Sequence, residues 1–278
     1  MLQEPSLPML VDGHVHIYSC FDIDALLDSA ATNFRRATGS PANVSAGRPI
    51  GCLALAETAR DHAFAALSAQ DARWRPRRWT VRPTGDAAAI TLRSPDNEEL
   101  VVLAGSQIAT VERLEVLALA TTQRYPDGRS LRETLGALAA DGVSAVIPWG
   151  FGKWWFGRGR IVMELMKQSE FRPFFLGDSG GRPTVAPRPK LFREAERREL
   201  PVLPGTDAFP YRSQQCKAGS FGFVLDSWHA DDRPAAEFRS QLARLQRSPP
   251  WFGSRVTCFE FAWLQLAMNA RARLQRPA

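Results

Sequence analysis

Histidine and lysine are scarce in this chain of 278 residues, which limits the functions open to it. With only four histidines, a site built from many imidazole ligands is excluded. Only four of the 35 basic residues are lysines, and such an arginine bias is more typical of genome base composition than of nucleic-acid binding. The densest basic stretch, residues 73–79, is typical of surface arginines that cover aromatic rings. We therefore expect no nucleic-acid partner.

The chain also lacks the patterns of a secreted or membrane protein. No apolar run is long enough for a membrane span, and the N-terminus lacks the basic and apolar regions of a signal peptide. The cysteines form no Cys-x-x-Cys pair and are typical of reduced thiols. These absences predict a cytoplasmic protein without a membrane partner.

The order of the expected elements predicts an α/β fold in one domain, residues 1–278. From residue 130 onward, apolar strands at 143–149, 173–178 and 201–207 alternate with helices. Such repeats imply a parallel sheet or barrel with right-handed crossovers. Residues 73–122 differ, because short strand-like pieces separated by turn signals predict an inserted antiparallel β-rich subdomain.

The segment that carries most chemistry is Leu10-Val11-Asp12-Gly13-His14-Val15-His16, near the N-terminus. Residues two apart in a strand point to the same side, so Asp12, His14 and His16 are expected on one face. Two imidazoles at one strand end can hold a divalent metal through neutral ring nitrogens. The alternative is a buried strand with two incidental histidines.

This strand resembles the opening strand of metal-dependent hydrolases of the amidohydrolase and PHP (polymerase-and-histidinol-phosphatase-like) groups. There, a first strand ending in His-x-His supplies two metal ligands at the mouth of a β/α barrel. Gly205-Thr206-Asp207 also resembles the late Gly-[Ser/Thr]-Asp of amidohydrolases, whose aspartate binds metal and acts as base toward the attacking water. The resemblance implies a (β/α) TIM-barrel-like fold, which could be incomplete or distorted, with Asp207 in that role.

Polar residues at the other strand ends complete the predicted site. In β/α barrels, functional side chains gather at the C-terminal ends of the strands. Those families use two further histidines from middle strands, but this chain retains only His62 and His229 elsewhere. Carboxylates would have to replace them, and a two-histidine, carboxylate-rich site suits zinc or manganese best. The predicted metal ligands are therefore His14, His16, Glu57, Asp178 and Asp207, and the predicted catalytic residues are Asp207 and Asp178.

Cations near the same strand ends predict a site for a small, anionic substrate. Lys153 follows one strand and Arg182 another, while Arg158 lies in the glycine-rich aromatic segment after Lys153. Alternatively, the aromatic residues of this segment only pack a helix and the arginine is solvated. Amide, ester and phosphoester substrates all stay open, and the oligomeric state cannot be read from the sequence.

Two other functions compete with the metal-dependent hydrolase. One is a metal-free binding or scaffold protein that retains the barrel. The other is a serine hydrolase, because Gly177-Asp178-Ser179-Gly180-Gly181 matches the segment around the nucleophile of chymotrypsin-like proteases. Those proteases are all-β, and the surroundings of His62 do not match their histidine motif, so we expect Ser179 not to be a nucleophile.

Overall fold

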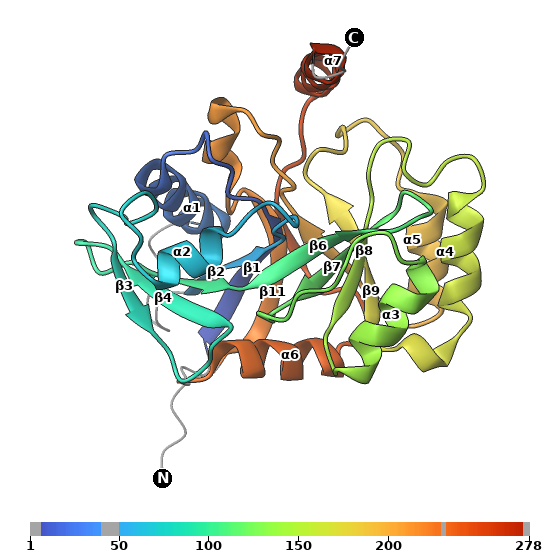
Figure 1. Ribbon diagram of the computed structural model, residues 1–278, viewed down its shortest axis with the longest axis horizontal. Helices are drawn as coiled ribbons and strands as arrows, with labels where there is room; N and C mark the ends of the chain where they lie inside the picture. Colours follow the sequence, from blue (N-terminus) through green and yellow to red (C-terminus); the bar gives the residue numbers. More distant parts are fainter. Residues whose placement is uncertain (1–6, 40–49, 229–231, 275–278) are drawn as a thin grey trace.

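The computed structural model describes residues 7–39, 50–228 and 232–274, and its strands form two mixed sheets (Figure 1). The larger sheet has seven strands, in the spatial order β12 (Trp251–Gly253), β11 (Phe221–Trp228), β1 (Leu7–Val15), β2 (Ile50–Leu55), β5 (Glu99–Leu103), β4 (Ala89–Arg93) and β3 (Thr80–Pro83). The smaller sheet has five strands, in the order β10 (Val202–Gly205), β9 (Phe174–Ser179), β8 (Ala145–Pro148), β7 (Glu115–Leu119) and β6 (Gly105–Ala109).

The predicted TIM-barrel-like fold is wrong, because neither sheet closes into a barrel. Closure would require β1 to pair with β10, but both edges of β1 are already occupied. β11 pairs with one edge antiparallel, and β2 pairs with the other edge parallel. The second edge of β2 is taken by β5, so among the described residues only one β-bridge, between Glu57 and Ser106, joins this edge to the smaller sheet.

The strand–helix repeats predicted from the second half of the chain do form a parallel unit. β8, β9 and β10 are parallel neighbours. The described helices are α1 (Ile23–Ala37), α2 (Ala63–Ser68), α3 (Leu131–Ala140), α4 (Arg158–Met166), α5 (Lys190–Arg197), α6 (Pro234–Arg244) and α7 (Cys258–Leu274), with 3₁₀ turns η2 (Ser169–Phe171) and η3 (Arg212–Lys217). Ser130 and Glu133 form a capping box at the start of α3.

The smaller sheet is buried on both faces, and one of these faces packs against the core of the larger sheet. Along β8 and β9, Ile147 and Phe174 belong to a core shared with α3, α4 and α5, whereas Val146 and Phe175 belong to the core of the larger sheet. This alternation is the two-residue period of a strand covered on both sides. Figure 1 shows α3, α4 and α5 on the side of the smaller sheet and α1 and α2 beside the larger one.

The strands within residues 73–122 are divided between the two sheets. β3, β4 and β5 form an antiparallel meander that extends the larger sheet beyond β2. β6 and β7 form a hairpin at the edge of the smaller sheet. The chain therefore crosses from one sheet to the other between Leu103 and Gly105, close to the end of β2.

Candidate metal centre

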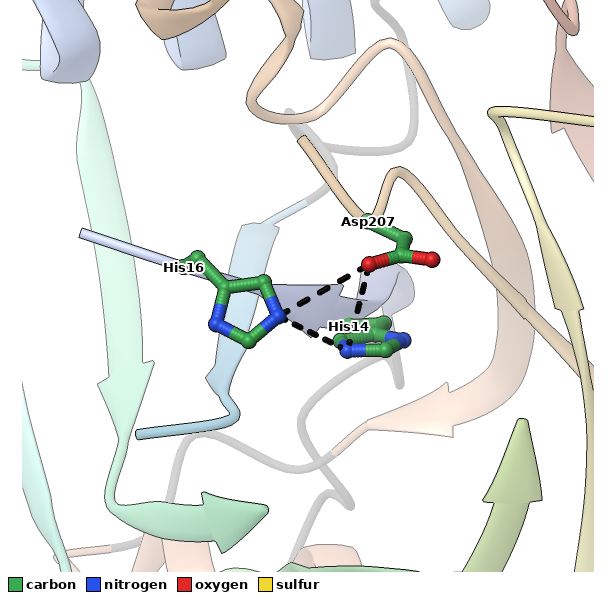
Figure 2. A group of neighbouring side chains, drawn as sticks. All are labelled: His14, His16 and Asp207. Atoms are coloured by element: carbon green, nitrogen blue, oxygen red, sulfur yellow. Dashed lines mark hydrogen bonds and ion pairs between the residues drawn. The ribbon is translucent and has the colours of Figure 1, made fainter. Parts of the chain in front are cut away.

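The two histidines of the His-x-His motif point toward each other at the end of β1. Their Nε2 atoms are 3.0 Å apart, and both side chains are almost fully buried (Figure 2). His14 is the penultimate residue of β1 and His16 follows its last residue, Val15. The pairing of β1 with β2 is irregular between Asp12 and Val15. The two imidazoles thus meet at the point where β1 leaves the regular sheet.

Asp207 reaches the same point from the smaller sheet. It follows β10 in the left-handed region, with a φ of 51°, and its backbone N–H donates to the carbonyl of His14 over 2.9 Å. A glycine is needed two residues before it, because a Cβ atom at Gly205 would lie 2.3 Å from the backbone nitrogen of His14. This close approach of β10 to β1 directs the Asp207 Oδ1 atom at both rings, 3.6 Å from His14 Nε2 and 3.7 Å from His16 Nε2.

His14, His16 and Asp207 form a group that could hold a metal ion. One ligand atom from each lies within 4.8 Å of the others. Two imidazoles and one carboxylate are a donor set that suits zinc and other first-row divalent metals. The histidines are buried, but the Asp207 side chain is 30% exposed, so one side of the group stays accessible. The donor set fits a catalytic metal with three protein ligands and an open position.

The electrostatics of the group favour the protonation states that a metal ligand needs. Burial lowers the pKa of His14 below its ordinary value, although Asp207 acts in the opposite direction, so the neutral imidazole is favoured. Burial alone would raise the pKa of Asp207, but His14, His16 and Lys153 together hold it well below its usual range. Asp207 is therefore a carboxylate at neutral pH. His16 Nδ1 is buried and lacks a hydrogen-bond partner among the described residues.

Asp12 anchors the strand turn that carries Asp207. Its carboxyl group accepts hydrogen bonds from the Thr206 backbone N–H over 2.8 Å, the Thr206 hydroxyl over 2.6 Å and the Gly219 N–H over 2.9 Å. Asp12 is fully buried, and burial raises its pKa to about 7 against the effect of these donors. The motif suggested that Asp12 would share a face with the histidines, but its role in holding Thr206 depends on a contact that the local sequence does not show.

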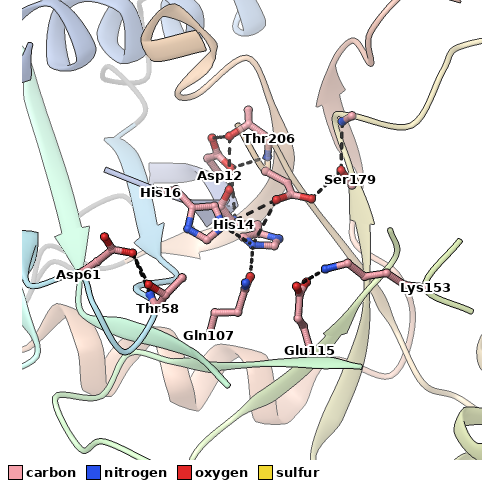
Figure 3. Close-up of polar contacts among 12 residues, drawn as sticks. Asp12, His14, His16, Thr58, Asp61, Gln107, Glu115, Lys153, Ser179 and Thr206 are labelled. Carbon is pink, nitrogen blue, oxygen red and sulfur yellow. Dashed lines mark hydrogen bonds and ion pairs between the residues drawn. The ribbon is translucent and has the colours of Figure 1, made fainter. Parts of the chain in front are cut away.

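Two further side chains lie near the metal-ligand group and were not predicted as site residues. Gln107, on β6, places its Oε1 atom 3.1 Å from His14 Nε2 (Figure 3). Glu115, on β7, forms an ion pair with Lys153, and both residues affect the charge state of the group electrostatically. Both come from the range predicted as an insertion, where neither residue follows a recognisable motif. Lys153 itself was predicted, and it lies on the same side as the histidines.

The other predicted site residues are held by partners of their own. Glu57 pairs with Arg124 at 2.5 Å and accepts the Phe64 N–H over 2.6 Å. Asp178 makes a two-pronged ion pair with the buried Arg182, at 2.6 and 2.8 Å. Arg158 donates to the carbonyl of Gly152 over 2.6 Å. None of these is in the metal-ligand group found among the described residues, and His229 lies outside those residues.

Clefts flank the metal-ligand group on two sides. One, with a volume of about 20 Å³, is lined by Asp207 together with Gly180, Gly181 and residues of η3 and α7. The other, with a volume of about 150 Å³, is lined by Gln107, Glu57, Arg124 and His62. Because Gln107 contacts His14 from the second cleft, a small molecule in that cleft would lie beside the group.

Within the metal-ligand group, Ser179 contacts Asp207 and neither of the histidines. Its hydroxyl donates to Asp207 Oδ2 over 3.0 Å and accepts the Gly181 N–H over 3.0 Å, and its side chain is buried. No histidine among the described residues makes a hydrogen bond to it. We therefore predict that a fluorophosphonate probe leaves Ser179 unlabelled, as measured by mass spectrometry with trypsin as the positive control. Stoichiometric labelling of Ser179 would revive the serine-hydrolase hypothesis.

Comparison with known proteins gives no family for this chain. No protein-family model matches it, and no curated protein is significantly similar to it. Within the part of the chain that the structure describes, no helix is long and apolar enough to cross a membrane. The functional assignment therefore depends on the residues of the site.

Proposed function

We propose that this protein is a metal-dependent hydrolase whose centre is formed by His14, His16 and Asp207. The observation that supports the proposal most is the convergence of two buried imidazoles and one carboxylate from two different sheets. Buried polar side chains normally have partners of their own, and three potential ligand atoms directed at one accessible point are typical of a metal site. Zinc or manganese is the ion that we propose for this donor set.

A divalent ion at this point would supply an activated water and a Lewis acid for the bond to be cleaved. Side chains of the protein would hold the reacting groups in position and accept a proton. Asp207 is the proposed base, because it stays ionised and because the Ser179 hydroxyl fixes its orientation at Oδ2. Gln107 Oε1 lies 3.1 Å from His14 Nε2, the same nitrogen that would bind the ion, so this amide would be a neighbour of the ion and not a partner that orients the ring.

Lys153 is the proposed contact for an anionic part of the substrate. Its charge helps to lower the pKa of Asp207, and its partner Glu115 is itself beside the group. Arg182 is buried in its pair with Asp178, and Arg158 is directed at a backbone carbonyl. We propose a small molecule with an amide, ester or phosphoester bond as substrate.

The second candidate function is a metal-free binding or scaffold protein. The 3.0 Å separation of the two Nε2 atoms favours it to some extent, because one neutral imidazole can donate a hydrogen bond to the other without any metal. In that case Asp207 and Gln107 would only be further hydrogen-bond partners of the histidine pair.

Hydrolysis assays with chromogenic ester, anilide and phosphodiester substrates distinguish the two candidates. We expect turnover that requires added Zn²⁺ or Mn²⁺ and is lost with chelator. Asp207→Asn should lower kcat by roughly 10²- to 10⁴-fold, the contribution typical of a general base. Asp96→Asn, at an exposed turn, is the matched control and should leave kcat unchanged. Metal-independent turnover, or equal activity of Asp207→Asn and the native protein, would contradict the proposed mechanism.

A further inference from the structure

α7 presents an apolar stripe to solvent. Phe259 is 90% exposed, Trp263 53% and Leu266 70%, and Ala262 between them is exposed as well. These positions are spaced i, i+3, i+4 and i+7, which is the pattern of a helix face that packs against a partner. Figure 1 shows α7 at the top of the molecule, clear of both sheets.

The opposite face of α7 is fixed to the rest of the chain. Leu264 is buried and lines the cleft next to Asp207. Glu260 forms an ion pair with Lys217 at 2.8 Å, and the ring of Phe261 packs on Phe151 with the centroids 5.1 Å apart. These contacts fix the inward face of α7, and the stripe therefore faces outward.

The segment around Phe151 exposes a second apolar surface, beside the inward face of α7. Trp155 and Phe156 are 53% and 93% exposed and form a chain of ring contacts with Phe151, which itself meets α7. The stripe itself exposes three large apolar side chains to about 70% on average, or roughly 400 Å² at about 200 Å² for each full side chain. An apolar patch of about 300 to 600 Å² is the largest on a typical monomer and is often functional. The stripe is therefore a surface of the size that a small, concentration-dependent interface buries on each partner.

We infer that this surface is the interface between two copies of the chain, with α7 of each packed antiparallel on α7 of the other about a twofold axis. The chemistry of the helix favours this occupant. From residue 258 to residue 270 the only charged residue is Glu260, and Lys217 of its own chain neutralises it. A helix that lies on a membrane carries lysines or arginines along its polar face, whereas the two arginines of α7, Arg271 and Arg273, both lie in its last turn.

The stripe is also self-complementary in the antiparallel direction. When Trp263 packs against the partner's Leu266, the bulky Phe259 comes opposite the partner's Ala270. Each large side chain near the end of the helix therefore meets a small one, as helix packing requires. A twofold arrangement uses the same surface on both copies, so it closes without leaving a free apolar face.

The oligomeric state of the purified full-length chain tests this inference. By light scattering coupled to size exclusion, we expect twice the chain mass at a protein concentration of about 100 µM, with dissociation on dilution. Trp263→Glu with Leu266→Glu should weaken association by at least about 30-fold, because aromatic anchors dominate interface energies. Trp251→Glu, an equally exposed tryptophan on β12, is the matched control and should leave association unchanged.

A charge swap tests the antiparallel arrangement itself. Trp263→Glu with Leu266→Arg places opposite charges across the pair, so this double variant should associate more tightly than the double-glutamate variant. Circular dichroism should show all variants folded, because the changed side chains are exposed in the native chain. A monomeric native protein at about 100 µM, or a monomer that binds phosphatidylserine vesicles through α7, would overturn the inference.

Discussion

Replacing both His14 and His16 with alanine is expected to abolish stoichiometric binding of Zn²⁺ or Mn²⁺. These two residues supply the only paired imidazoles among the described residues, and Asp207 alone cannot hold a divalent ion in competition with water. The native protein should gain about 2.7 kcal/mol of stability when the metal is present at 100 times its dissociation constant. The double variant should gain none, as measured by metal analysis and by thermal unfolding with and without metal.

A control variant at another histidine distinguishes the loss of a metal ligand from the loss of any imidazole. His62 lines the second cleft but is outside the metal-ligand group, so His62→Ala should keep full metal content. Zinc can bind surface cysteines, and the exposed Cys20, Cys216 and Cys258 should be alkylated before the measurement. A native protein that is prepared without chelator and takes up neither metal would refute the metal-centre proposal and favour the metal-free binding protein.

The sequence predicted those parts of the site that are formed by short motifs. The His-x-His pair at a strand end and the Gly205-Thr206-Asp207 turn can each be recognised from a few consecutive residues. The structure brings them together because Gly205 permits the close approach of β10 to β1. Glu57 follows β2 and Asp178 lies near the end of β9, but each pairs with an arginine. Position at a strand end did not distinguish a metal ligand from half of an ion pair.

The barrel prediction failed because one edge of β1 pairs with a strand that is distant in the sequence, β11. The direction of β11 and its place beside β1 depend on pairing between residues about 210 positions apart, such as Val11 with Phe223. Periodicity within a segment reports which residues are apolar and not which strand will be its neighbour. The same limit explains why Gln107 was missed, because its contact with His14 joins two different sheets.

Asp12→Ala is expected to be the most destabilising single change near the site. It would leave the donors of Thr206 and Gly219 buried without an acceptor, and each such group costs about 1 to 3 kcal/mol. We expect the free energy of unfolding to fall by roughly 3 to 5 kcal/mol, which lowers Tm by about 10 °C for a chain of this size. Asp22→Ala, which removes the exposed cap of α1, should cost only about 1 kcal/mol. Equal effects of the two changes would show that Asp12 does not anchor the turn.

The Asp12 carboxyl group should make the free energy of unfolding depend on pH. Burial raises the pKa of folded Asp12 to about 7, whereas an aspartate in the unfolded chain titrates near 4. Between these values the folded state binds more protons than the unfolded state, so this group's contribution to stability is full below about pH 4 and is lost as the pH rises toward 7. The stability difference between native protein and Asp12→Asn, measured by denaturant unfolding with chelator present, should therefore shrink across that range. A difference that stays constant with pH would show that Asp12 titrates at its ordinary value and is held as an anion by Thr206 and Gly219.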